Sequence, residues 1–470
     1  MSVTESVVEA GGLIAEKHVW YRSTLFNACL IGFVGFLAPG LWNAMNSLGA
    51  GGEEKPFLVN AANALVFGLM GIFCIFGAPI ANRIGLKWAL VIGATGYPLY
   101  SAGLYTNDRF GNIWFVLFGS ACCGISAGLY WAVEGAIAIG YPEPEKRAKY
   151  LNIWVIWSTM GPVVGDAIVL GLNIETGGEG SVGYTTYIVF IALQCLAVPL
   201  ALALSSPEKV QRKDGSRVIV RPGQSWKDEF KALWRTCKMR SVILLLPIFW
   251  AIYFNEYSSN YETYYFTVRA RALIAFVSNW ICILASQSLA LFLDWKKFDR
   301  KTRITYSWYW VMLVHVVTWI YAWVVQSEYT HSQPMFDIHT PGFTKGAFVI
   351  FLWQFAQQNG LNWLYYLIGQ LTDDISELTR LTGILRGQIS FGEAISYGLN
   401  THDWYGGRAP MAVNTILLGL CVVPTWIAVR NYVPDENAPK ADDAAKSIHE
   451  SESDQKPEID TEVVLPEKQE

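Results

Sequence analysis

The stretch IWFVLFGSACCGISAGLYWAVEGAIAI, residues 113–139, holds 27 residues and a single charged side chain, Glu134. A helix needs about 20 apolar residues to cross the hydrocarbon core of a bilayer. Eleven further runs of similar character are present, and lipid offers no partner for exposed backbone groups, so all are expected to be helical. The twelve expected spans cover residues 22–47, 57–81, 87–105, 113–139, 150–172, 184–204, 241–266, 272–293, 304–326, 343–368, 381–400 and 410–430.

The composition excludes an ordinary soluble protein. Hydrophobic residues make up 52% of the chain and charged residues 16%, against roughly a quarter charged in soluble domains. No basic face is left for nucleic acid. We expect a cytoplasmic amino terminus (1–21), a first six-helix half (22–204), a basic cytoplasmic linker (205–240), a second half (241–430) and an acidic, disordered cytoplasmic tail (431–470).

Basic residues indicate the orientation of the spans. If both termini are cytoplasmic, all but six of the 35 Lys and Arg residues lie inside, as the positive-inside rule requires. The six outside are Lys55, Arg109, Arg269, Arg271, Lys345 and Arg408. The chain is therefore predicted to be an integral multi-pass protein with cytoplasmic termini. A plasma membrane and a vacuolar-type membrane both remain open.

The linker between the two halves contains an expected amphipathic helix. Trp226, Phe230, Leu233 and Trp234 follow the spacing i, i+4, i+7, i+8, which places apolar side chains on one face of a helix. Such a helix can lie on the cytoplasmic leaflet, with its lysines toward anionic lipid.

Six spans, a linker and six more spans indicate a duplicated, transporter-like body. Polar side chains at mid-depth are costly in lipid and therefore mark a candidate solute cavity. The alternative is that they join neighbouring helices. Gly35, Pro39 and Gly40 predict a bend in the first span, and the polar run 253–265 predicts a kink or unwinding in the seventh. The candidate cavity residues are Asn43, Asn46, Tyr130, Glu134, Asn255, Glu256, Gln354, Gln357, Gln358 and Asn362.

Three acids are candidates for carrying a proton: Glu393 near the midplane, Glu134 in the inner half and Asp166 in the outer half. Each could instead be a structural partner of a buried group. For Glu134 that partner would be a basic residue at the inner rim, Lys146 or Arg147. Because Arg386 lies two turns from Glu393 on the same face, direct contact between them is not expected.

Neither a cofactor nor a metal site is predicted. Eight cysteines are present, but no CxxC pair occurs and no histidine lies at ligand spacing from a cysteine. The chain has no GxSxG, HExxH or P-loop motif, so it is not expected to be an enzyme. The expected partners are the bilayer, a small solute and protons, with another membrane protein as an alternative.

Two loops resemble a motif of the major facilitator superfamily. APIANRIGLK (78–87) is similar to that superfamily's Gly-x-Leu-Ala-Asp-Arg-x-Gly-Arg-Lys loop, with Asn82 in place of the Asp, and LDWKKFDRK (293–301) is its counterpart in the second half. The resemblance implies a cytoplasmic latch in which the acid faces a helix end. With Asn82 neutral, the first latch would rest on hydrogen bonds. The implied latch residues are Asn82, Arg83, Gly85, Lys87, Asp294, Lys296 and Lys297.

The stretches 26–52, 157–166 and 353–360 resemble fungal-type members of the uncoordinated-93 (unc-93-like) family. This implies an all-α membrane protein of twelve transmembrane helices with the major facilitator fold, in two pseudo-symmetric halves of six. The resemblance is compatible with two functions. One is a secondary transporter of a small organic solute, proton-coupled and working by alternating access. The other is a non-transporting regulator or chaperone of an ion channel or another membrane protein.

Overall fold

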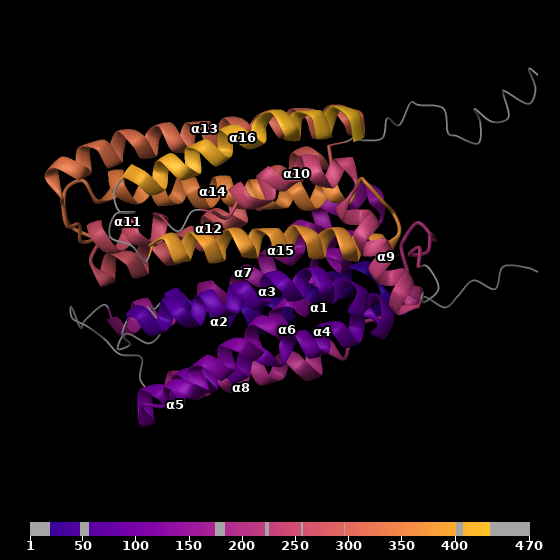
Figure 1. The fold of residues 1–470 in the computed structure, drawn as a ribbon, viewed down its shortest axis with the longest axis horizontal. Helices are drawn as coiled ribbons and strands as arrows, with labels where there is room; N and C mark the ends of the chain where they lie inside the picture. Colours follow the sequence, from indigo (N-terminus) through magenta and orange to yellow (C-terminus); the bar gives the residue numbers. More distant parts are fainter. Residues whose placement is uncertain are drawn as a thin grey trace, which may run out of the picture.

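A computed structural model describes residues 19–47, 56–173, 184–220, 225–254, 257–295, 297–400 and 408–432. These parts of the chain form a bundle of long helices, with loops between them and no strand (Figure 1). The expected acidic tail from 433 onward and the expected amino-terminal segment before Val19 lie outside the described residues.

Every expected span coincides with helix. In the first half the helices are α1 (Thr24–Gly35), the π-turn η2 (Phe36–Gly40), α2 (Leu41–Ser47), α3 (Pro56–Ile84), α4 (Leu86–Ala94), α5 (Gly96–Phe110), α6 (Ile113–Gly140), α7 (Arg147–Asn173) and α8 (Tyr184–Ala201). After these come α9 (Trp226–Cys237), α10 (Arg240–Ala251), α11 (Tyr257–Tyr265), α12 (Val268–Leu293), α13 (Arg300–Ser332), α14 (Phe343–Ile368), α15 (Ile375–Asn400) and α16 (Arg408–Tyr432).

Six continuous helices of the described chain are long and apolar enough to cross a membrane by length and composition. They are Thr24–Met45, Ala62–Ile84, Ile113–Gly140, Arg269–Leu293, Arg300–Ser332 and Arg408–Asn431. Two other expected spans are interrupted. The third divides into α4 and α5 at Thr95, and the seventh divides where α10 ends at Ala251 and α11 begins at Tyr257.

The predicted bend of the first span is present. Pro39 lies within the π-turn η2 between α1 and α2, and a proline cannot donate the backbone hydrogen bond that a regular helix needs. The turn packs closely on α7, because a Cβ added at Gly161 would lie 2.5 Å from the carbonyl oxygen of Phe36. Only a residue without a side chain fits there.

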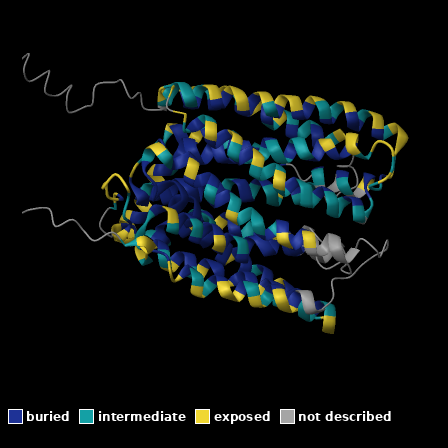
Figure 2. Cartoon of the chain, turned by 180° about the vertical axis from the view of Figure 1, so that it is seen from behind, coloured by how far each residue is buried: buried dark blue, intermediate teal, exposed yellow. Residues whose placement is uncertain are grey.

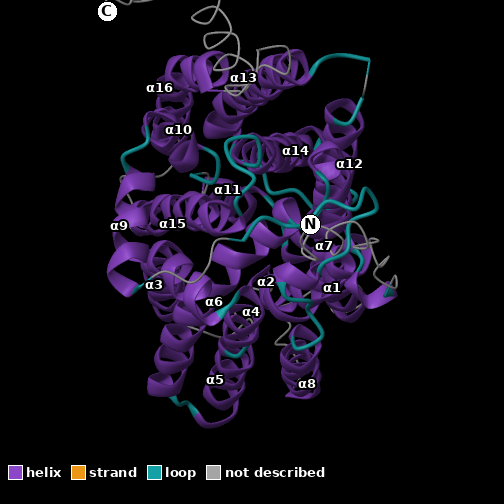
Figure 3. Cartoon of the chain, turned by 90° about the vertical axis from the view of Figure 1, so that its right-hand side faces the viewer, coloured by secondary structure: helices purple, strands orange, loops and turns teal. Residues whose placement is uncertain are grey.

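The two halves of the bundle meet mainly along three helix pairs. α15 packs on α3 and on α6, and α12 packs on α7. We call the end of the bundle that carries α9 the linker end, and the opposite end the far end. Both ends of the described chain lie at the linker end (Figures 1 and 3). Buried residues gather toward that end as well (Figure 2), so the halves are packed together most closely there.

Candidate functional site

A buried polar cluster joins the two halves. From the first half, Tyr130 Oη on α6 and Trp154 Nε1 on α7 both donate to Glu134 Oε1, each over 2.6 Å. From the second half, Arg386 on α15 donates through Nε to Tyr365 Oη on α14 over 2.5 Å. The ring of Trp154 meets the ring of Tyr365 edge to face, with centroids 5.6 Å apart. We call these five residues the inter-half cluster.

An aromatic ring strengthens the contact between the halves. The Arg386 guanidinium lies 4.0 Å from the centroid of the Trp131 ring on α6. Such a cation–π contact is favourable, and most so where water is excluded. Arg386 therefore binds to both halves, to Trp131 of the first and to Tyr365 of the second.

The cluster is sealed from solvent but not fully satisfied. Glu134 is 0% exposed and Arg386 is 6% exposed. Glu134 Oε2 has no hydrogen-bond partner among the described residues. No basic group of the described residues lies within ion-pair distance of this carboxylate. Lys146 and Arg147, which were the partners of Glu134 in the alternative interpretation, form ion pairs with Glu143 and Asp373 instead. Buried carboxylates are costly unless paired, which makes Glu134 a candidate functional group.

Arg147 instead closes the linker end. It donates to the carbonyl oxygens of Ile139, over 2.9 Å, and of Gly369, and forms an ion pair with Asp373 over 2.7 Å. Lys146 pairs with Glu143 over 3.3 Å. Because Gly369 and Asp373 follow α14, Arg147 holds the start of α7 against the second half. Burial lowers the pKa of the Arg147 guanidinium, against the pull of Asp373.

A second connection at the linker end runs through α9. Glu229 on α9 forms an ion pair with Arg380 on α15 over 3.0 Å, and both side chains are buried. Asn82, at the end of α3, donates through Nδ2 to Glu229 Oε2 over 3.2 Å and to the Ser376 carbonyl oxygen over 3.0 Å. Asn82, a predicted latch residue, therefore joins α3 to α9 and α15 by hydrogen bonds; that these contacts act as a latch stays a prediction. Glu229 and Arg380 were missed, because only the fold brings them together.

Asp294, the acid of the second predicted latch, faces a helix start, as the resemblance implies; that this contact acts as a latch stays a prediction. Asp294 follows α12 and accepts a hydrogen bond from the backbone N–H of Lys149, in the first turn of α7, over 2.7 Å. Free backbone N–H groups at a helix start favour a carboxylate. Burial nevertheless raises the pKa of Asp294 to about 6. Of the other predicted latch residues, Arg83 and Lys297 are exposed, Lys87 is half-buried, Gly85 takes a positive φ of 94°, and Lys296 lies outside the described residues.

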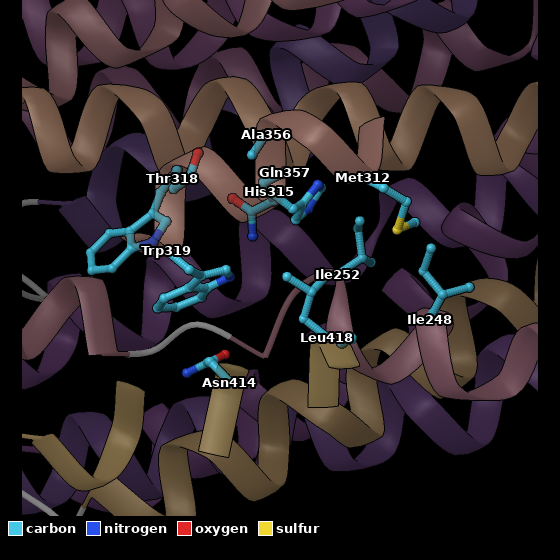
Figure 4. A pocket seen from close by; sticks show the side chains of 12 residues that line it. Ile248, Ile252, Met312, His315, Thr318, Trp319, Ala356, Gln357, Asn414 and Leu418 are labelled. Atoms are coloured by element: carbon cyan, nitrogen blue, oxygen red, sulfur yellow. The ribbon is translucent and has the colours of Figure 1, made fainter. Parts of the chain in front are cut away.

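The amides of α14 have different partners. Gln354 accepts a weak hydrogen bond from Cys282 Sγ on α12, over 3.7 Å. Gln358 donates to Asn362 over 2.9 Å. Gln357 instead lines a pocket within the second half, together with His315, Trp319 and Asn414 (Figure 4). The spacing of Gln354 and Gln357 along the sequence could not show that their side chains face different helices.

The remaining candidates are dispersed. Asn43 is exposed. Asp166, on α7, accepts a hydrogen bond from Asn279 of α12 over 2.8 Å, so it joins the halves away from the cluster. Glu393 is half-buried on α15, in electrostatic range of Cys74 and Tyr253. Asn255, Glu256 and the side chain of Asn46 lie outside the described residues. Trp154 was missed because tryptophan in an apolar run carries no signal of its own.

The arrangement of helices is that of the major facilitator superfamily. The fucose:proton symporter of E. coli matches with a TM-score of 0.61 at 12% identity, covering 86% of this chain and 97% of the symporter. The human organic anion transporter MFSD10 matches with a TM-score of 0.61 at 10% identity, covering 88% of this chain and all 100% of that one. The fold is therefore that of a multi-pass membrane protein of this superfamily.

Sequence comparison narrows the class to a family. The family described as "Ion channel regulatory protein UNC-93" matches residues 60–285. "Notoamide biosynthesis cluster protein O'" of Aspergillus versicolor is 37% identical, over 88% of this chain and 90% of its own length. A UNC93-like protein of Schizosaccharomyces pombe is 33% identical, over 82% of this chain and 78% of its own. The chain belongs to the UNC-93-like family.

Proposed function

We propose that this protein is a proton-coupled secondary transporter of a small organic solute, working by alternating access between its two halves. In this account the linker end faces the cytoplasm, as the positive-inside rule indicates. Glu134 carries the coupling proton. Glu393 and Asp166 are further candidates: Glu393 lies in electrostatic range of Cys74 and Tyr253, and Asp166 joins the halves through Asn279.

One observation carries the proposal, the inter-half cluster. Protonation of Glu134 would remove the negative charge that lies in electrostatic range of Arg386, and Arg386 contacts both halves. In a low-dielectric interior such a change of charge has a large effect on the balance between two packings. A proton on Glu134 would therefore shift the equilibrium between closed and open arrangements of the halves.

The comparisons support transport in general, without pointing to a particular solute. The solved neighbours include a symporter that couples fucose to protons, and the Aspergillus relative is named for a biosynthesis cluster of a small molecule. The family description names an ion channel regulator, which is the competing reading. A scaffold that only binds another protein has no need of a buried, half-satisfied carboxylate between its halves, because such a group lowers stability.

The test compares the small-molecule contents, inside and outside, of cells that lack this protein, cells restored with the wild type, and cells restored with Glu134→Gln at equal membrane abundance. Glutamine keeps the shape of the side chain but cannot release a proton. Glu393→Gln, made in parallel, shows whether the second acid matters.

We expect at least one solute to shift on deletion, to return with the wild type, and to fail to return with Glu134→Gln. If no solute shifts, transport is contradicted, and a search for a bound membrane protein becomes the next step. If Glu134→Gln restores every solute, transport stands but the assignment of the proton to Glu134 is wrong.

A further inference from the structure

The three sides of α9 differ in chemistry. One side, with Glu229, Ala232, Leu233 and Thr236, is buried against the bundle. The next side round the helix carries Trp226, Phe230 and Trp234, which are 45%, 43% and 62% exposed. One residue further on in each turn come Lys227, Lys231 and Arg235, all exposed. At 3.6 residues per turn, this spacing places the aromatic side between the buried side and the basic side.

The aromatic side faces the outer surface of the bundle. Phe230 meets Phe76 of α3 with ring centroids 6.3 Å apart, and Phe76 is itself 47% exposed in a helix apolar enough to span a bilayer. α9 lies at the rim of the bundle, beside α3 and α15 (Figure 3). Tryptophan is enriched where a membrane meets water. The aromatic side therefore lies at the level of the lipid headgroups, with the basic side next to it.

The buried side ties this surface to the latch. Glu229 contacts Asn82 of the first half and Arg380 of the second through the same oxygen, Oε2. If the halves separate at the linker end, one of these two contacts must break. Any interaction that holds α9 in place therefore favours the closed linker end.

We propose that α9 is a lipid-responsive clamp: anionic phospholipid headgroups bind Lys227, Lys231 and Arg235, and this binding stabilises the closed linker end through Glu229. The ligand class follows from charge complementarity, because three exposed cations stand beside an apolar side at headgroup depth. Basic side chains close to an anionic membrane surface are each attracted appreciably. The clamp rests on the opening of the linker end that the proposed function includes, but it needs no solute, so a failed lipid test would leave the transport proposal standing.

The test uses the full chain in vesicles of phosphatidylcholine alone, or of phosphatidylcholine and phosphatidylserine in a three-to-one mixture. Ser376→Cys, in a background without the native cysteines, places a reporter thiol at a buried position where α15 meets Asn82. The rate at which a water-soluble maleimide labels it measures the opening of the linker end. The triple variant Lys227→Gln, Lys231→Gln, Arg235→Gln removes the basic side.

We expect the maleimide to label Ser376→Cys about tenfold more slowly in vesicles that contain phosphatidylserine than in vesicles of phosphatidylcholine alone. Three fully engaged cations could give a larger effect than this. The triple variant should label at one rate in both membranes, and Glu229→Gln should label fast in both. Equal rates for the unaltered α9 in the two membranes, or a lipid effect that survives in the triple variant, would overturn the proposal. If labelling is too slow to measure in both, the same comparison in an Asn82→Ala background, whose latch is weaker, decides it.

Discussion

At the scale of single residues, Asn82 shows why a departure from a family motif can be an adaptation. Its amide donates to the Glu229 carboxylate, and the Asp usual at this place in the motif would put two carboxylates against each other. Asn82→Asp should lower the free energy of unfolding by about 1–3 kcal/mol, the usual cost of a buried, badly paired charge. Thermal unfolding of the purified protein measures it.

The matched control for that change is the double variant Asn82→Asp, Glu229→Gln, in which the new carboxylate faces an amide instead of a second carboxylate. It should unfold at a higher temperature than Asn82→Asp alone. If the double variant is no more stable than the single one, the contact with Glu229 does not explain why an asparagine stands here.

A second prediction at this scale concerns the space that glycine leaves for the inter-half cluster. A Cβ added at Gly135 would lie 2.3 Å from Cε1 of Tyr365, whereas one at Gly419 meets nothing within 4 Å. Gly135→Ala should destabilise the protein by about 1–3 kcal/mol through overpacking, and Gly419→Ala should leave its unfolding temperature almost unchanged. Equal effects of the two changes would show that Tyr365 does not pack against α6 in this way.

At the scale of elements, the contact between the loop after α12 and the start of α7 predicts a pH dependence. In the closed latch the pKa of Asp294 is about 6, whereas an exposed aspartate titrates near 3.9. Between these values the closed latch binds more protons than the open one, so a fall in pH from about 7 to about 5 at the linker end favours closure.

Labelling of Ser376→Cys, corrected for the pH dependence of a free thiol, should therefore slow as the pH falls through about 6. Asp294→Asn removes the titrating group, so its labelling rate should no longer change over this range. Labelling that speeds up on acidification would mean that the sign of the linkage is wrong.

The sequence predicts the helices themselves better than it predicts the contacts between them. Long apolar runs such as 113–139 have one solution in lipid, so the twelve helices could be predicted. Pro39 likewise marked the bend of the first span. Partners between helices could not be predicted in this way, because α14 presents Gln354 and Gln357 to different neighbours. The pairing of Glu134 with Trp154, and of Glu229 with Arg380, depends on how helices pack, which no spacing along one helix encodes.

At the scale of the whole molecule, the transport proposal assigns the contacts across the linker end to one of two states. Arg147, Asp294 and Glu229 each join parts of the chain that belong to different halves or to the linker. Glu229 and Arg380 are buried, and breaking a buried ion pair is costly unless water or other groups replace the lost partner, as they would in a state whose linker end is open to solvent. Alternating access therefore requires a second state in which the linker end is open.

The most direct test measures distances between spin labels at both ends of the bundle. Arg83→Cys with Lys297→Cys reports on the linker end, and Phe110→Cys with Met335→Cys on the far end, all at exposed positions. Each pair is made in a cysteine-free background, with Glu134 intact or changed to Gln. We predict two distance populations at each end of the bundle. The short distance at the linker end should occur together with the long distance at the far end. Glu134→Gln should change the proportions of the two populations. A single population at each end, unchanged by Glu134→Gln, would contradict alternating access.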